Sequence, residues 1–286
     1  TISPKKNALD LNFREIWRYR DLLLLFVKRD VITLYKQTIL GPLWYFIQPL
    51  FTSIIFTLVF NNIAEIKTGN GIPPFLFNLA GITVWGYFST CLNETSDTFK
   101  KNQGIFGKVY FPRVIMPMAT VLSNLIKFGI QLLVFICFYV YFLFFTQSAF
   151  NASPTIAVLF LPLIVFVMAL LGLGFGMIIS SMTTKYRDLS FLVGFGVQLL
   201  MYGSAVMYPL SLIQEKVSQG TLPVWVGTVI EYNPMTTIVE LFRNMALGVN
   251  DLSIEKLLYA SIVGVLVFLA GLIVFNKTEK QFIDTV

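Results

Sequence analysis

Three polar side chains in one long apolar run are the first candidates for chemistry. Asn124, Lys127 and Gln131 lie in the third such run, at spacings of three, four and seven residues. Those spacings place them on one face of a helix, and a lysine at the centre of a membrane helix costs about 2.5–3.5 kcal/mol. One interpretation is a wetted path or a contact with a polar substrate. The alternative is a lysine near the cytoplasmic end of the helix that reaches water or pairs with Glu94 or Asp97.

Aromatic and amide side chains offer a second chemistry, the binding of sugars. Flat aromatic faces suit sugar rings, whose C–H groups can lie against a π-cloud, and the chain holds 28 Phe, 12 Tyr and 4 Trp. The alternatives are ordinary packing for the aromatics and hydrogen bonds between helices for the amides. With Lys127, the candidates for a substrate path are Tyr45, Gln48, Phe51 and Phe56 in the first apolar run and Phe195, Gln198, Tyr202 and Tyr208 in the fifth.

The sequence lacks residues that are typical of ATP binding, of general-base catalysis and of metal sites. An ATP-binding loop ends in Gly-Lys-Ser/Thr, whereas the nearest string, residues 104–110, has the wrong spacing and no Ser or Thr after its lysine. The sequence contains no histidine, the usual general base and commonest metal ligand. Cys91 and Cys137 lie in apolar runs, as small buried hydrophobic residues do. We predict no catalytic residue, no metal site and no cofactor in this chain.

Composition indicates a membrane protein. Hydrophobic residues make up 56% of the 286 residues and charged residues 13%, about half of the roughly 25% found in soluble domains. The mean hydropathy is +0.74. We therefore predict one all-α integral membrane domain over residues 1–286.

Six apolar runs are long enough for the roughly 20 residues that cross a bilayer. They fall within a membrane region at 42–275. The predicted spans are residues 42–61, 74–93, 115–145, 154–182, 189–208 and 254–275.

Basic residues predict the orientation of these spans. Sixteen Lys and Arg lie in segments on the side of both termini, and four lie in segments on the other side. The positive-inside rule then places both termini in the cytoplasm. This distribution explains the net charge of +6 without a nucleic-acid partner.

Two further segments are neither spans nor simple loops. Residues 12–37 carry apolar residues at helical spacing among basic ones, which predicts an amphipathic helix on the cytoplasmic membrane surface. Residues 209–251 would lie outside, as short re-entrant helices between the fifth and sixth spans. Within them, Asn233 and Pro234 suit a helix start, and Glu240 and Arg243 can pair across one turn.

Several strings of this sequence resemble those of one transporter family. Residues 20–50, RDLLLLFVKRDVITLYKQTILGPLWYFIQPL, are similar to the entrance of the first span in type-two ABC exporter permeases. The resemblance is closest to the branch that exports O-antigen, capsule and teichoic-acid polymers. Further similar strings follow in the family's order and are residues 108–117, 185–189, 204–209 and 232–248.

The resemblance implies a partnership and a substrate. Such permeases work as homodimers with two cytoplasmic ATP-binding cassette subunits, which bind ATP and Mg²⁺. The path lies between the two copies, largely along the first and fifth spans. The substrate is a glycan on a polyprenyl diphosphate lipid, and the membrane is the bacterial cytoplasmic (inner) membrane.

The resemblance also assigns roles to particular residues. The loop at 97–113 resembles the helix that docks on the ATPase, and basic residues of the amphipathic helix would attract the diphosphate, or simply anionic lipids. The coupling residues would be Asp97, Lys100, Lys101, Lys108 and Arg113. The cytoplasmic entrance would be lined by Arg14, Arg18, Arg20, Lys28, Arg29 and Lys36. The external gate would include Asn233, Pro234, Glu240 and Arg243.

Three alternatives remain open. Related permeases export lipids or small molecules, although they tend to lack the long basic helix before residues 41–44. A membrane glycosyltransferase or lipid phosphatase would need clustered Asp, His or Arg, whereas the 15 acidic residues here are scattered. A non-catalytic membrane scaffold would fail to bind an ATPase.

Overall fold

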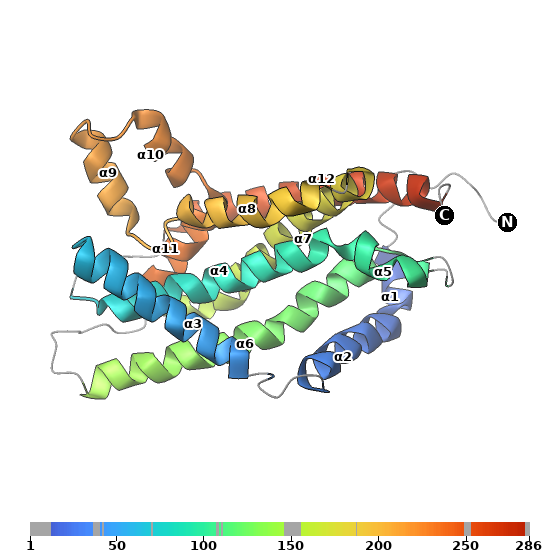
Figure 1. The fold of residues 1–286 in the computed structure, drawn as a ribbon, viewed down its shortest axis with the longest axis horizontal. Coiled ribbons are helices and arrows are strands. Elements are labelled where there is room, and N and C mark those ends of the chain that lie inside the picture. Colours follow the sequence, from blue (N-terminus) through green and yellow to red (C-terminus); the bar gives the residue numbers. More distant parts are fainter. Residues whose placement is uncertain are drawn as a thin grey trace.

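The protein is a bundle of long helices (Figure 1). The computed structural model describes residues 13–36, 41, 43–69, 71–106, 109, 111–145, 156–186, 188–248 and 253–283. The side chains of residues 13–15, 34–35 and 280–283 are outside this description. The described residues form helices and no strands, which confirms the all-α fold class.

Five helices in the described ranges are long and apolar enough to cross a membrane. They match the first to fourth and the sixth predicted spans, and the third has the predicted bounds. α3 (Leu43–Phe56) continues through a π-helical segment, η1 (Thr57–Ile63). α7 (Leu161–Lys185) follows a short 3₁₀ helix, η2 (Ile156–Phe160). The others are α4 (Pro74–Ser96), α6 (Ile115–Phe145) and α12 (Ile254–Ile283).

The fifth predicted span is shorter than expected. α8 (Leu189–Tyr202) has 14 residues and is roughly 21 Å long, against about 30 Å of hydrocarbon. The prediction of helix to residue 208 is wrong, because Gly203 ends the helix and Ala205 has a left-handed backbone with φ of 49°. A total of six spans therefore stays a prediction.

α4 is the central helix of the bundle. Most of its side chains are buried, among them Leu76, Leu79 and Phe88. It packs against α3 on one side and α8 on another, and against α6, α7 and α11 (Pro234–Leu247). Figure 1 shows α4 between α3 and α8.

Polar side chains tie the π-helical segment to α4. The Asn78 amide donates to Asn61 Oδ1 at 2.8 Å and to Thr57 Oγ1 at 3.1 Å. On α3, the Ser53 hydroxyl donates to the Phe75 carbonyl at 3.0 Å. These bonds satisfy polar groups that would otherwise be costly in an apolar surrounding, and they fix α3 and η1 against the first turns of α4.

α7 and α12 cross at two glycines. A Cβ added to Gly271 would clash with the Gly174 carbonyl oxygen. A Cβ on Gly174 would lie 2.7 Å from the Val267 carbonyl. Small residues allow helix backbones to approach this closely in membranes, where dispersion contacts drive association.

We expect Gly271→Leu to lower the free energy of unfolding by about 1–3 kcal/mol or more, because backbone has to move apart. Gly129→Leu on α6 is the matched control, since a Cβ there meets nothing within 4 Å. Denaturation in detergent measures both variants. Equal stability of the two would contradict the close crossing.

The N-terminal segment forms two helices, α1 (Phe13–Arg18) and α2 (Arg20–Lys36), with the break at Tyr19. α2 packs against α6, and its buried Phe26 lies 5.7 Å from the Phe111 ring. The predicted amphipathic helix at 12–37 is thus confirmed as helix over its described residues. Residues 12 and 37 lie outside them.

The predicted external segment contains three helices, α9 (Leu210–Ser218), α10 (Val224–Glu231) and α11. α9 and α10 project beyond the bundle at the end opposite the C-terminus (Figure 1). α11 instead lies inside, packed on α4 and α12. Its predicted start is confirmed, because Asn233 Oδ1 accepts from the Met235 N–H at 2.9 Å and Pro234 is its first residue.

Candidate functional site: the corner between α4 and α5

A sharp corner separates α4 from the short helix α5 (Thr98–Phe106). Phe99 and Phe106 bury one face of α5, and the Phe99 ring stacks on Phe275 of α12 with centroids 4.6 Å apart. Lys100 and Lys101 lie on the exposed face. Since α5 lies at the end of the bundle that holds the C-terminus (Figure 1), it presents a charged surface anchored by aromatic packing.

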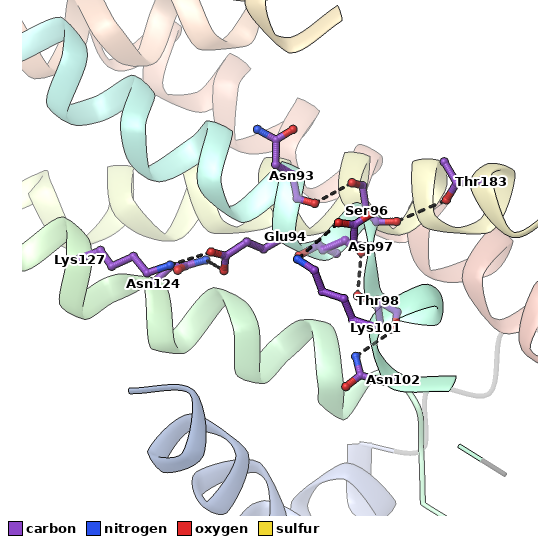
Figure 2. Close-up of polar contacts among 11 residues, drawn as sticks. Asn93, Glu94, Ser96, Asp97, Thr98, Lys101, Asn102, Asn124, Lys127 and Thr183 are labelled. Atoms are coloured by element: carbon purple, nitrogen blue, oxygen red, sulfur yellow. Dashed lines mark hydrogen bonds and ion pairs between the residues drawn. The ribbon is translucent and has the colours of Figure 1, made fainter. Parts of the chain in front are cut away.

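An ion pair joins α4 to α6 one turn before the corner (Figure 2). Lys127 Nζ lies 2.7 Å from Glu94 Oε1, and the Asn124 amide donates to Glu94 Oε2 at 2.9 Å. Lys127 is 9% exposed, while the Glu94 side chain keeps 34% exposure. Lys127 Nζ also lies 5.4 Å from the centre of the Tyr45 ring of α3. The carboxylate therefore holds two side chains of α6 at once.

Lys127 is thus paired with Glu94, one of the two acidic residues that the sequence predicted as its partner. Asp97 instead lies 3.4 Å from Lys101 Nζ on α5. Gln131 also faces α4, because a Cβ on Gly86 would lie 2.9 Å from Gln131 Oε1. The polar face of α6 packs against α4, so within one chain it does not line an open path.

Two more contacts tie the corner to other helices. The Thr183 hydroxyl of α7 donates to the Ser96 carbonyl at 3.4 Å (Figure 2). Arg113, buried between α5 and α6, lies 3.8 Å from Glu279 Oε1 of α12. Burial lowers the pKa of Arg113, and the Glu279 carboxylate opposes that change. Movement of α5 would therefore reach α6, α7 and α12.

The predicted coupling residues have different surroundings. Lys100 and Lys101 are exposed and available to a partner, and Asp97 is half-buried. Arg113 is buried, so it positions the corner and does not offer a docking surface. Lys108 lies outside the described residues.

Most of the predicted path residues lie on two separate helices, α3 and α8, whereas Tyr208 follows the end of α8 and Lys127 is on α6. α3 and α8 flank α4 (Figure 1), so one chain does not bring the two sets together. Phe51 is 62% exposed and Phe195 64% exposed. Also exposed are Gln48, Gln198 and Tyr202, whereas Tyr45, Phe56 and Tyr208 are half-buried.

The predicted entrance residues form an exposed basic surface on α1 and α2. Arg29 Nη2 lies 2.8 Å from Asp30, and its guanidinium lies over the Phe26 ring. Arg14 is in α1, but its side chain is outside the description. The exposed members are Arg18, Arg20, Lys28, Arg29 and Lys36.

Arg243 of the predicted external gate has an unexpected set of partners. It is 1% exposed. Its Nη1 donates to the Ala205 carbonyl at 2.8 Å, its Nη2 donates to the Val206 carbonyl, and its Nε donates to the Phe77 carbonyl at 3.3 Å. The predicted pair with Glu240 is present at 3.4 Å. A single arginine thus satisfies carbonyls of α4 and of the segment after α8.

Our sequence analysis missed these carbonyl partners, together with Ser204. The Asn233 amide donates to the Gly203 carbonyl at 2.8 Å and to Ser204 Oγ at 3.0 Å. The feature of the sequence that could have predicted buried partners for Arg243 is its position on the apolar side of a short helix. Such an arginine needs several acceptors.

The contacts at the corner connect α4 and α5 with α6, α7 and α12. Within the described ranges, no three Cys, Asp or Glu residues gather in a way that could hold a metal ion. The geometry of the corner suits the passing of motion from an exposed helix to the spans around it.

Comparison with known proteins identifies the type of chain that has this architecture. The family model described as "ABC-2 type transporter" matches residues 21–247. The O-antigen export system permease protein RfbA of Klebsiella pneumoniae is 29% identical over 270 residues, which cover 92% of this chain and 94% of that protein. RfbA of Myxococcus xanthus is 24% identical over 273 residues, covering 96% and 98%.

A further relative is the polysialic acid transport protein KpsM of Escherichia coli, which is 20% identical over 257 residues, covering 90% of this chain and 93% of that protein. The family match extends from the first turn of α2 to the last residue of α11 and so includes the α4–α5 corner. This chain therefore belongs to the ABC-2 type transporter family and is a multi-pass membrane protein.

Proposed function

We propose that this chain is the membrane permease half of an ATP-driven exporter that moves lipid-linked polysaccharide from the cytoplasm to the outer side of the membrane. The observation that carries this proposal is the match over most of the chain to relatives named as O-antigen export permeases and as a polysialic acid transport protein. These names and the family describe transporters, which argues against the alternative of a glycan-processing enzyme.

ATP is hydrolysed by a partner. Two cytoplasmic ATP-binding cassette subunits bind ATP and Mg²⁺, and the exposed face of α5 docks on one of them. When the partners close on ATP, α5 moves with them. The contacts of Glu94 with Lys127 and of Thr183 with Ser96 carry this motion to α6 and α7.

Both termini lie in the cytoplasm, in line with the distribution of Lys and Arg. The bundle end with α5 then faces the cytoplasm, and α9 and α10 shape the exit on the outer side. The membrane is the bacterial inner membrane.

The path forms between two copies of the chain. α3 and α8 each present an exposed glutamine, Gln48 and Gln198, among apolar residues. Such amides are costly against lipid, which favours a second copy or a hydrated path as their neighbour. Phe51, Phe195 and Tyr202 add exposed aromatic faces for sugar rings.

The substrate enters at the basic surface of α1 and α2. A polyprenyl diphosphate carries the glycan, and the exposed arginines suit bidentate contacts with its phosphates.

Deletion of this chain in its host, followed by fractionation of lipid-linked glycan, tests the proposal. Polymer that accumulates inside with none at the surface supports it and identifies the glycan. Unchanged surface glycan, in a host without a second exporter, indicates a lipid or small-molecule exporter. Loss of synthesis indicates an enzyme.

We expect Lys100→Glu with Lys101→Glu to uncouple ATP hydrolysis from export, because the charge of the docking face is reversed. Export per ATP hydrolysed in proteoliposomes should fall about tenfold or more, since like charges across an interface cost several kcal/mol. Lys216→Glu, an exposed lysine on α9 at the other end, is the control. Normal export by the double variant would count against docking at α5.

A further inference from the structure

Two cavities lie beside α8 at the α5 end of the bundle and share one lining residue. The first has a volume of about 300 Å³ and is lined mainly by polar residues, including Lys100, Thr184 and Ser190. The second, of about 360 Å³, is almost entirely apolar and extends along α8 between α7 and α4. Thr183 lines both. We name the two adjacent cavities together the α7–α8 cleft, in which the first is the polar mouth and the second the apolar body.

The apolar body is open to the surroundings of the bundle. Leu192 lines it and is still 61% exposed. Gly196 also lines it, and a Cβ on Gly196 would meet nothing within 4 Å. In a membrane, such a body is filled by hydrocarbon, because water gains no hydrogen bonds there.

In the part of the chain that the structure describes, the polar mouth is lined by one lysine, Lys100, and one carboxylate, Asp97. The carboxylate of Asp97 is paired with Lys101. Because Asp97 is already paired with Lys101, the positive charge of Lys100, which has no ion pair among the described residues, is left for an anionic ligand.

We propose that the α7–α8 cleft binds an anionic phospholipid from the leaflet at the α5 end, with one acyl chain in the apolar body and its phosphate at the mouth beside Lys100. The single charge of Lys100 matches a phosphodiester head group, which carries one negative charge, better than it matches a diphosphate. The path residues proposed on α8, Phe195, Gln198 and Tyr202, do not line this cleft, and the site does not depend on which polymer is exported.

A lipid in the α7–α8 cleft would restrict the movement of α8. This helix packs against α4 and α7, and the cleft lies between them. A lipid there fills the space that would otherwise allow α8 to close onto α7, so its presence would hold α8 in the position seen here.

Native mass spectrometry of the purified full chain tests the site, after reconstitution in vesicles of equal parts phosphatidylglycerol and phosphatidylcholine. Gly196→Leu fills the apolar body. Gly194→Leu is the matched control, because Gly194 lies on the same helix, is exposed, and has no atom within 4 Å of an added Cβ. Lys100→Gln removes the charge at the mouth and leaves the apolar body intact.

We expect one retained phosphatidylglycerol per chain in the wild type and in Gly194→Leu, and about tenfold lower occupancy in Gly196→Leu, which corresponds to a tenfold weaker equilibrium. Lys100→Gln should lose the preference for phosphatidylglycerol over phosphatidylcholine. Full retention by Gly196→Leu would overturn the proposal. So would equal retention of the two lipids by the wild type, or a polyprenyl phosphate as the lipid retained from cells.

Discussion

Replacement of Arg243 by leucine should lower the free energy of unfolding by about 3–5 kcal/mol, the range seen when one partner of a buried charge network is removed. Arg243 is almost fully buried and donates to the carbonyls of Phe77, Ala205 and Val206. Leucine leaves the buried Ala205 and Val206 carbonyls, which lie outside any helix, without these donors, and each such loss costs about 1–3 kcal/mol. The effect should appear as a lower denaturation midpoint of the purified chain in detergent.

Two further variants separate this explanation from a general loss of packing. Arg243→Lys keeps the charge but cannot direct donors at three separate carbonyls, so it should be nearly as unstable as the leucine variant. Gly81→Ala tests the same cluster from α4, since its Cβ would lie 2.6 Å from both Arg243 Nη2 and the Val206 carbonyl. Wild-type stability of Arg243→Lys would show that the charge alone matters and not the directed bonds.

The origin of the Arg243 cluster explains why part of this fold could not be predicted from the sequence. Residues 203–208 are apolar enough to continue a membrane helix, and the hydropathy of the run predicted that they would. Their backbone leaves the helix at Gly203, and its freed carbonyls are satisfied by Asn233 and Arg243, which come from a later part of the chain. The hydropathy of one apolar run gives no information about hydrogen-bond partners that come from a later part of the chain.

Other elements were predictable because their causes are local. The run at 115–145 is long and mostly apolar, and it forms α6 with those bounds. The start of α11 depends on Asn233 and Pro234 alone, and it was predicted correctly. At the candidate site, spacing placed Asn124, Lys127 and Gln131 on one face of α6. The choice of Glu94 over Asp97 as the partner of Lys127 depends on how α4 turns against α6, which spacing along α6 does not specify.

Removal of the ion pair between Glu94 and Lys127 should lower both the free energy of unfolding and the coupling of ATP hydrolysis to export. Lys127→Met leaves Glu94 with Asn124 as its remaining partner in the cluster, and Glu94→Gln leaves a nearly buried ammonium beside a neutral amide. Breaking a buried pair costs about 3–5 kcal/mol. Because a third of the Glu94 side chain is exposed, we expect about 2–3 kcal/mol for either change, since surface pairs are worth much less.

A double-mutant cycle isolates the pair itself. The variant with both Glu94→Gln and Lys127→Met should be more stable than the sum of the two single losses predicts, by an interaction energy of about 1–2 kcal/mol. Strict additivity, measured by denaturation in detergent, would contradict a direct interaction between the two side chains.

The consequence for transport follows from where the pair lies, one turn before the corner that leads into α5. If α5 moves with the ATPase, Glu94 moves with it, and Lys127 and Asn124 oblige α6 to follow. Either single variant should therefore hydrolyse ATP at a near-normal rate while exporting several-fold less per ATP. The exchanged variant, Glu94→Lys with Lys127→Glu, restores opposite charges at the same two positions and should regain part of the export. Single variants that retain full export per ATP would show that α6 receives the motion of α5 by another route.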